Sequence, residues 1–144
     1  MKKIVFLLIS VFSLFAFAQE SEEFRSPGTA SYYLAPVEAS GIDGTMQVTE
    51  QIDMGSRIVV SLSGIDTGQN YDLELYEGNC GPDRVLVTEL EPVGEFSNDP
   101  YVSLNDTELD FTQLTEGDYF LYVLQDNKIL ACGEVGLGAN ASTN

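Results

Sequence analysis

The sequence contains no histidine among its 144 residues. Serine and cysteine nucleophile triads need an imidazole as general base, so that class of catalysis is excluded. Imidazole is also the ligand that suits copper, whereas carboxylates alone suit harder ions. The sequence therefore predicts neither a hydrolytic triad nor copper redox chemistry.

Positive charge is also scarce. Six Lys and Arg residues stand against 23 Asp and Glu residues, which gives a formal net charge of −17. Such a chain does not bind a phosphate backbone by default, and it is not attracted to anionic lipid. The composition predicts no nucleic-acid partner and is typical of a solvated, exported protein surface.

The one long apolar run is at the N-terminus. Lys2 and Lys3 precede the apolar stretch 4–15, and Ala16-Phe17-Ala18 forms an A-x-A cleavage site. The alternative is a membrane anchor, but the run is short for a bilayer core of roughly 30 Å. We expect residues 1–18 to be a signal peptide, the protein to be secreted or periplasmic, and no membrane attachment after cleavage.

Cysteine occurs only twice. Cys80 lies in a turn, and Cys132 lies in the apolar, strand-like run 129–136. Two cysteines in an exported chain indicate one disulfide rather than a metal site, and closing a loop this long would stabilise the fold by about 4 kcal/mol. Two free thiols or an intermolecular bridge are the alternatives.

Short runs of residues alternate with turn signals from Ser31 onward. This spacing is typical of an antiparallel sandwich or barrel, and no window shows a helical period with caps, so we expect almost no helix. The predicted turns are 41–44, 53–56, 66–68, 78–83, 92–94, 98–100, 105–106, 116–118 and 126–127.

Apolar residues alternate with polar ones inside several of these runs. The pattern predicts that one face of each strand packs in the core. We expect Asp72, Glu74 and Tyr76 to face outward, and the segment 119–124, which is apolar on both faces, to be a central strand. The predicted core positions are Met46, Val48, Ile58, Val60, Leu62, Leu73 and Leu75.

One domain is expected after the signal peptide. Residues 19–30 mix Glu, Ser, Pro and Gly and predict a disordered lead-in. We expect the β-sandwich domain over 31–138 and a polar tail over 139–144. The length after residue 18 is enough for one domain with a core of its own.

Four segments in order carry a resemblance to a known family: Gly44–Gln51, Val60–Ile65, Glu74–Gly81 and Leu130–Gly136. They resemble four segments of copper/zinc superoxide dismutases. The first two resemble that family's early strand and the strand before its Gly-Leu turn. The last two resemble its H-x-H-E-x-G metal segment and its L-A-C-G-x-x-G signature. In that family the signature cysteine is bridged to a loop cysteine. The related chordin-type (CHRD) domain resembles the middle segment about as well.

The resemblance implies a Greek-key β-sandwich or barrel of about eight antiparallel strands, immunoglobulin-like in its layering, with Cys80 bonded to Cys132. The departures concern the metal. Glu74 and Tyr76 stand where the family has two metal histidines, and Ile129 stands where it has an arginine that guides the anionic substrate. The stretches that correspond to the zinc loop (81–100) and to a later histidine strand (119–125) contain no histidine either.

Other chemistry has weaker support. Any pair of the 23 carboxylates could serve a glycosidase, but no pair stands out. Aspartates near turns could hold calcium, although aspartate also favours turns for backbone reasons. Five tyrosines could form a glycan-stacking surface or could edge the core. They are Tyr71, Tyr76, Tyr101, Tyr119 and Tyr122.

We expect a secreted, non-catalytic β-sandwich module that resembles copper/zinc superoxide dismutase, has no cofactor, and serves as a structural or binding domain for an extracellular partner. One alternative is a member of that family with residual or non-standard metal binding. The other is a calcium- or glycan-binding module.

Overall fold

The chain folds into an all-β domain in a computed structural model that describes residues 26–52, 55–95, 97 and 99–141. The predicted signal peptide, residues 1–18, lies outside these ranges. So does the lead-in up to residue 25.

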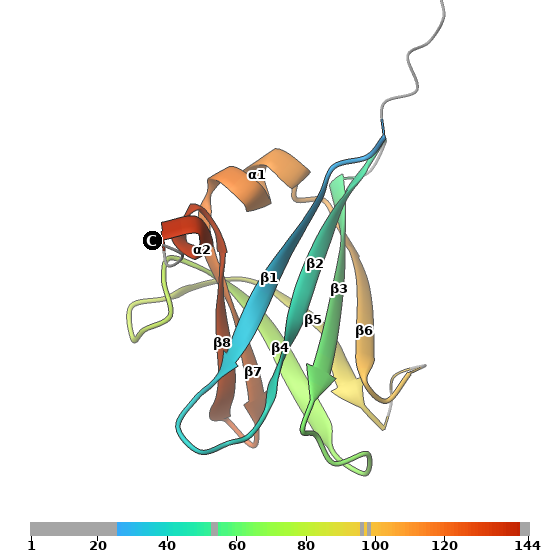
Figure 1. Ribbon diagram of the computed structural model, residues 1–144, viewed down its shortest axis with the longest axis vertical. Coiled ribbons are helices and arrows are strands. Elements are labelled where there is room, and N and C mark those ends of the chain that lie inside the picture. The colour runs from blue at the N-terminus through green and yellow to red at the C-terminus, as the bar shows by residue number, and fades with distance from the viewer. Residues whose placement is uncertain (1–25, 53–54, 96, 98, 142–144) are drawn as a thin grey trace, which may run out of the picture.

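Eight strands account for most of the described chain, as the alternation predicts (Figure 1). The only described helices are one short helix before β7 and one after β8, and neither is long enough to cross a membrane. The first strand begins two residues before the expected domain start, and the second helix begins at Leu137, inside the expected domain, and runs into the expected tail. The elements are β1 (Thr29–Pro36), β2 (Asp43–Gln51), β3 (Gly55–Ser63), β4 (Asn70–Glu77), β5 (Val85–Gly94), β6 (Val102–Thr107), α1 (Phe111–Glu116), β7 (Asp118–Gln125), β8 (Lys128–Gly136) and α2 (Leu137–Ala141).

The strands follow the order β5-β4-β7-β8-β1-β2-β3-β6, and every pairing is antiparallel. We call β1, β2, β3 and β6 sheet A, and β8, β7, β4 and β5 sheet B. The first part of β1 pairs with β2, whereas Ala35 and Pro36 pair with β8, so β1 joins the two sheets. Because β7 returns beside β4, the strands β4 to β7 form a Greek key, which confirms the expected fold class.

The core lies between the two sheets. All seven core positions expected from the alternation are buried, including Met46 and Val48 on β2 and Ile58 and Val60 on β3. Fully burying a side chain of this size stabilises the fold by about 1.5–3 kcal/mol relative to leaving it exposed. Leu114 of α1 is also fully buried in this core.

The strand β7 is central, as predicted, and is buried on both faces. Leu121 and Val123 belong to the main core, while Phe120, Tyr122 and Leu124 belong to a second, smaller cluster on the other side of sheet B. A strand with two buried faces explains why the segment reads as a continuous apolar run. The second cluster brings together the residues considered as a functional site.

The barrel does not close through backbone pairing between β5 and β6, which occupy the two ends of the strand order. Side chains of β6 close it instead. Asn105 Oδ1 accepts a hydrogen bond from the Glu91 amide at 2.7 Å, and Ser103 Oγ donates to the Glu91 carbonyl at 2.5 Å. Two predicted turns are wrong, because residues 92–94 lie in β5 and Asn105-Asp106 lies inside β6.

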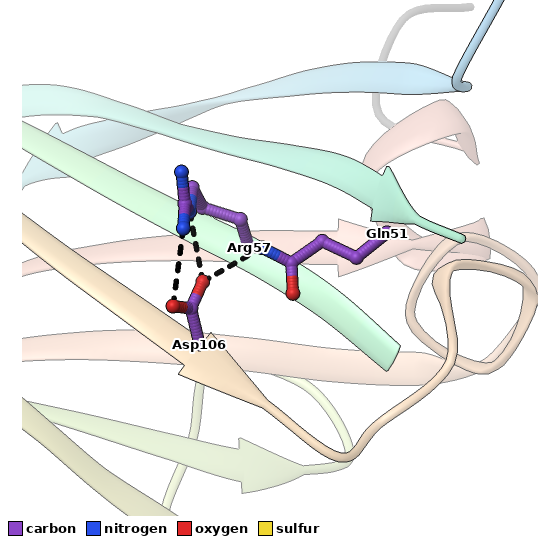
Figure 2. Close-up of polar contacts among 3 residues, drawn as sticks. All are labelled: Gln51, Arg57 and Asp106. Atoms are coloured by element: carbon purple, nitrogen blue, oxygen red, sulfur yellow. Dashed lines mark hydrogen bonds and ion pairs between the residues drawn. The ribbon is translucent and has the colours of Figure 1, made fainter. Parts of the chain in front are cut away.

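On the outer face of sheet A, β6 is tied to β3 and β2 by a charged contact (Figure 2). Arg57 donates two hydrogen bonds to Asp106, from Nε at 2.8 Å and from Nη2 at 3.1 Å, and Gln51 donates a third at 2.8 Å. The guanidinium beside Asp106 lowers the pKa of that carboxyl.

Candidate functional site

The positions at which the resemblance places metal ligands lie on sheet B, on the face turned away from the core. Glu74 and Tyr76 are on β4, directly opposite Tyr122 and Phe120 of β7. Tyr76 leaves the core face as expected, but it is only 7% exposed. The outward orientation expected for Tyr76 is found, but its side chain is buried against the residues described next.

Three aromatic rings form the centre of this face. The rings of Tyr76 and Phe120 stack with centroids 5.3 Å apart, and Tyr122 meets both edge-on, at 5.6 Å and 4.9 Å. Aromatic pairs in these geometries contribute roughly 0.5–1.5 kcal/mol each beyond the area that they bury. We call Tyr76, Phe120 and Tyr122 the aromatic cluster.

A cation lies over the aromatic cluster. The guanidinium carbon of Arg84 is 5.0 Å from the ring centroid of Tyr76 and 5.2 Å from that of Tyr122. Arg84 ends the loop 78–84 between β4 and β5, so the cation is covalently part of the segment that contacts the rings. A guanidinium within about 6 Å of an aromatic face is attracted by the ring quadrupole.

The same loop is bonded to β7 and β8. Tyr122 Oη donates to the Gly81 carbonyl at 2.9 Å and is 3.1 Å from the Gly81 amide, which donates back to it. Cys80 is bonded to Cys132, whose Cα lies 6.3 Å away, and Cys132 is directly opposite Tyr122 in the sheet. The expected disulfide is confirmed, and no described cysteine is free. The disulfide and the Tyr122 bonds thus hold adjacent residues of the loop.

The hydroxyl of Tyr76 faces a carboxylate. It donates a hydrogen bond to Glu74 Oε2. Burial raises the pKa of Tyr76, the hydrogen bond to Glu74 and its charge raise it further, and Arg84 opposes them. The phenol is therefore held in its protonated form, which is a poor metal ligand.

The structure brings Glu74 and Tyr76 into direct contact, and half-buried Ile129 packs against the same cluster. They do not converge with further carboxylates. Across the described residues, no three His, Cys, Asp or Glu side chains are grouped so that they could hold a metal ion.

Arg84 is the functional residue that the sequence analysis missed. Two signals pointed to it: it is one of only six cations in the chain, and it follows Cys80 by four positions. Its position over two rings depends on the fold, because Tyr76 and Tyr122 are on different strands.

The tyrosines do not form the stacking surface considered for a glycan. Tyr71, Tyr76 and Tyr122 are at most 7% exposed, and Tyr119 is partly buried. Tyr101 is the exposed member of the five, at 47%.

The fold and the site together define a disulfide-linked Greek-key β-sandwich with an aromatic cluster under a cross-strand loop. Comparisons with protein-family models, curated proteins and solved structures found no match to the chain. The relation to copper/zinc superoxide dismutases or chordin-type domains therefore stays a prediction from the sequence segments.

Proposed function

We propose that this protein is an exported, non-catalytic β-sandwich module that serves as a structural or binding domain. The observation that carries the proposal is the guanidinium of Arg84 over Tyr76 and Tyr122, at the positions where the resemblance would place a metal. A positive charge at that place opposes a second cation by Coulomb repulsion, which solvent weakens because Arg84 itself is exposed.

The donor atoms argue in the same direction. Catalytic zinc sites use three protein ligands and an open fourth position. Here Glu74 supplies one carboxylate, and the Tyr76 hydroxyl donates a hydrogen bond to that same carboxylate. The sulfur atoms of Cys80 and Cys132 are bonded to each other and are not thiolates.

The proposal is tested by metal loading. The oxidised protein, starting at Gln19, is incubated with copper(II) and zinc(II), desalted, and analysed for bound metal by mass spectrometry and for superoxide dismutation. We expect far less than one metal ion per chain and no catalysed dismutation. Stoichiometric copper or zinc together with activity would contradict the proposal.

Two variants test whether the charge of Arg84, in addition to the shortage of metal ligands, keeps metal ions out of the site. Arg84→Gln removes the cation over the rings, and Lys128→Gln removes an exposed cation elsewhere as the control. If repulsion contributes, Arg84→Gln binds more copper than the parent protein, and Lys128→Gln does not. Equal metal uptake by both variants would show that the guanidinium has no part in excluding metal.

A further inference from the structure

The facing edges of β5 and β6 lack backbone partners in the part of the chain that the structure describes. Each strand pairs on one side only, β5 with β4 and β6 with β3. An unpaired strand edge presents a row of N–H and C=O groups that another extended chain can pair with. We call the space between the two edges the seam.

Side chains take the place of a strand partner at the middle of the seam. The amide and carbonyl of Glu91 are bonded to Asn105 and Ser103, and Asn105 Nδ2 donates to Ser103 Oγ at 2.8 Å. Ser103 is 2% exposed and Asn105 is 8% exposed. These bonds occupy the amide and carbonyl of Glu91, so another chain could pair only with edge residues on either side of this point.

Two open cavities lie along the seam. One, of about 450 Å³, is lined by Pro92 on β5 and by Val102 and Leu104 on β6, among others. The other, of about 370 Å³, is lined by Thr88 to Glu91 and by Asn105 to Thr107. Leu104 is 55% exposed, which is unusual for leucine on a strand and provides an apolar contact at the groove.

The seam is acidic. Glu89, Glu91, Asp99 and Asp106 line its cavities. Only Asp106 has a cation partner among the described residues, namely Arg57 on the outer face of sheet A. A ligand that carries positive charge would therefore find uncompensated carboxylates on the β5 side of the groove.

We propose that the seam binds an extended, basic segment of a partner polypeptide, which pairs with a free strand edge. Successive side chains of such a segment point to opposite sides, so alternate residues would reach the carboxylates of β5 and the apolar contact at Leu104. A second copy of this chain fits less well, because it would bring further carboxylates to Glu89 and Glu91. The inference goes beyond the proposed function and does not depend on it, since metal uptake at Tyr76 would leave the seam unchanged.

The test uses blocked peptides and the isotope-labelled, oxidised protein starting at Gln19. The probe is an eight-residue peptide of alternating Lys and Val, compared with an alternating Glu and Val peptide and with a Lys-Val peptide interrupted by Pro, which cannot donate to a ladder. We expect the first peptide alone to shift the amide resonances of β5 and β6. If the Pro-containing peptide shifts the β5 and β6 resonances as much as the Lys-Val peptide does, the peptide does not bind by strand pairing. If the shifts are confined to residues outside β5 and β6, the peptide does not bind at the seam.

Reversing the charge of two carboxylates on β5 tests whether the peptide binds at the seam. Glu89→Lys/Glu91→Lys is expected to weaken binding of the Lys-Val peptide at least about tenfold, a change of 1.4 kcal/mol. The matched control is Glu116→Lys/Asp126→Lys at two exposed carboxylates away from the seam. Equal weakening by both double variants, no binding at millimolar peptide, or dimerisation of the free protein through the same amides would each overturn the proposal.

Discussion

Tyr122 is the residue at which the loop 78–84, the aromatic cluster and the disulfide meet. Its ring contacts Tyr76 and Phe120, and its hydroxyl makes two bonds to Gly81. Because Cys132 is directly opposite in the sheet, the covalent and the hydrogen-bonded attachments of the loop are adjacent. The Tyr122 side chain is therefore one of the contacts that hold the loop on sheet B.

The hydroxyl of Tyr122 can be removed with little change in ring packing. Tyr122→Phe is expected to lower the free energy of unfolding by about 1 kcal/mol, because the Gly81 amide and carbonyl lose their shared partner. Hydrogen exchange at Gly81 should also become faster. The control is Tyr119→Phe, since the Tyr119 hydroxyl has no hydrogen-bond partner in the described chain. Equal effects of the two variants, measured by urea unfolding, would contradict the assigned role.

The raised pKa of Tyr76 predicts that the protein loses stability as the pH rises into the alkaline range. The pKa of Tyr76 is raised in the folded protein, chiefly by burial and then by Glu74, above the ordinary tyrosine value of 10.0. A raised pKa gives a contribution that is fully present below 10.0 and is lost as the pH rises through the folded pKa, because the unfolded tyrosine ionises first. Tyr76→Phe should flatten this part of the stability curve, and an unchanged alkaline slope would contradict the assignment.

At the scale of elements, alternation predicted the strands whose inward residues fill the core. It predicted the buried faces of β2, β3 and β4, and the central place of β7. It did not predict β6, where a turn was expected at 105–106, and where Leu104 is exposed while Ser103 and Asn105 are buried. The pattern is reversed because the inward side chains of β6 bond to β5 across an unpaired edge, a contact that no local sequence pattern encodes.

The site shows the same division between local and non-local causes. Sequence segments pointed to Glu74, Tyr76 and Ile129, and the chain's two cysteines pointed to a bridge between Cys80 and Cys132. The burial of Tyr76 could not be predicted, because Arg84 covers it from a loop whose path depends on the whole sheet.

The loop 78–84 and the strand β8 are the two elements that the disulfide joins. Its cysteines are 52 positions apart, for which the chain-entropy picture gives about 4 kcal/mol of stabilisation. Cys80→Ser/Cys132→Ser should therefore unfold at a markedly lower urea concentration than the oxidised parent, with a steeper dependence on urea because the unfolded chain without the crosslink exposes more surface. A loss below about 1 kcal/mol would mean that native strain cancels the loop-closure gain.

At the scale of the whole molecule, two of the three cations among the described residues are already engaged. Arg57 is paired with Asp106, and Arg84 lies over the aromatic cluster, in a chain with 23 carboxylates. The surface therefore has little positive potential with which to attract a small anion such as superoxide. The same imbalance favours basic partners, as the seam proposal requires.

In the proposed function, Arg84, the aromatic cluster and the disulfide hold the loop 78–84, and no metal ion is needed. The most direct test is the free energy of unfolding of the oxidised protein, measured with copper(II), with zinc(II) and with a chelator. We expect the same value in all three conditions. A value that rises with metal concentration, by about 2.7 kcal/mol at one hundred times the Kd, and falls with chelator would contradict it.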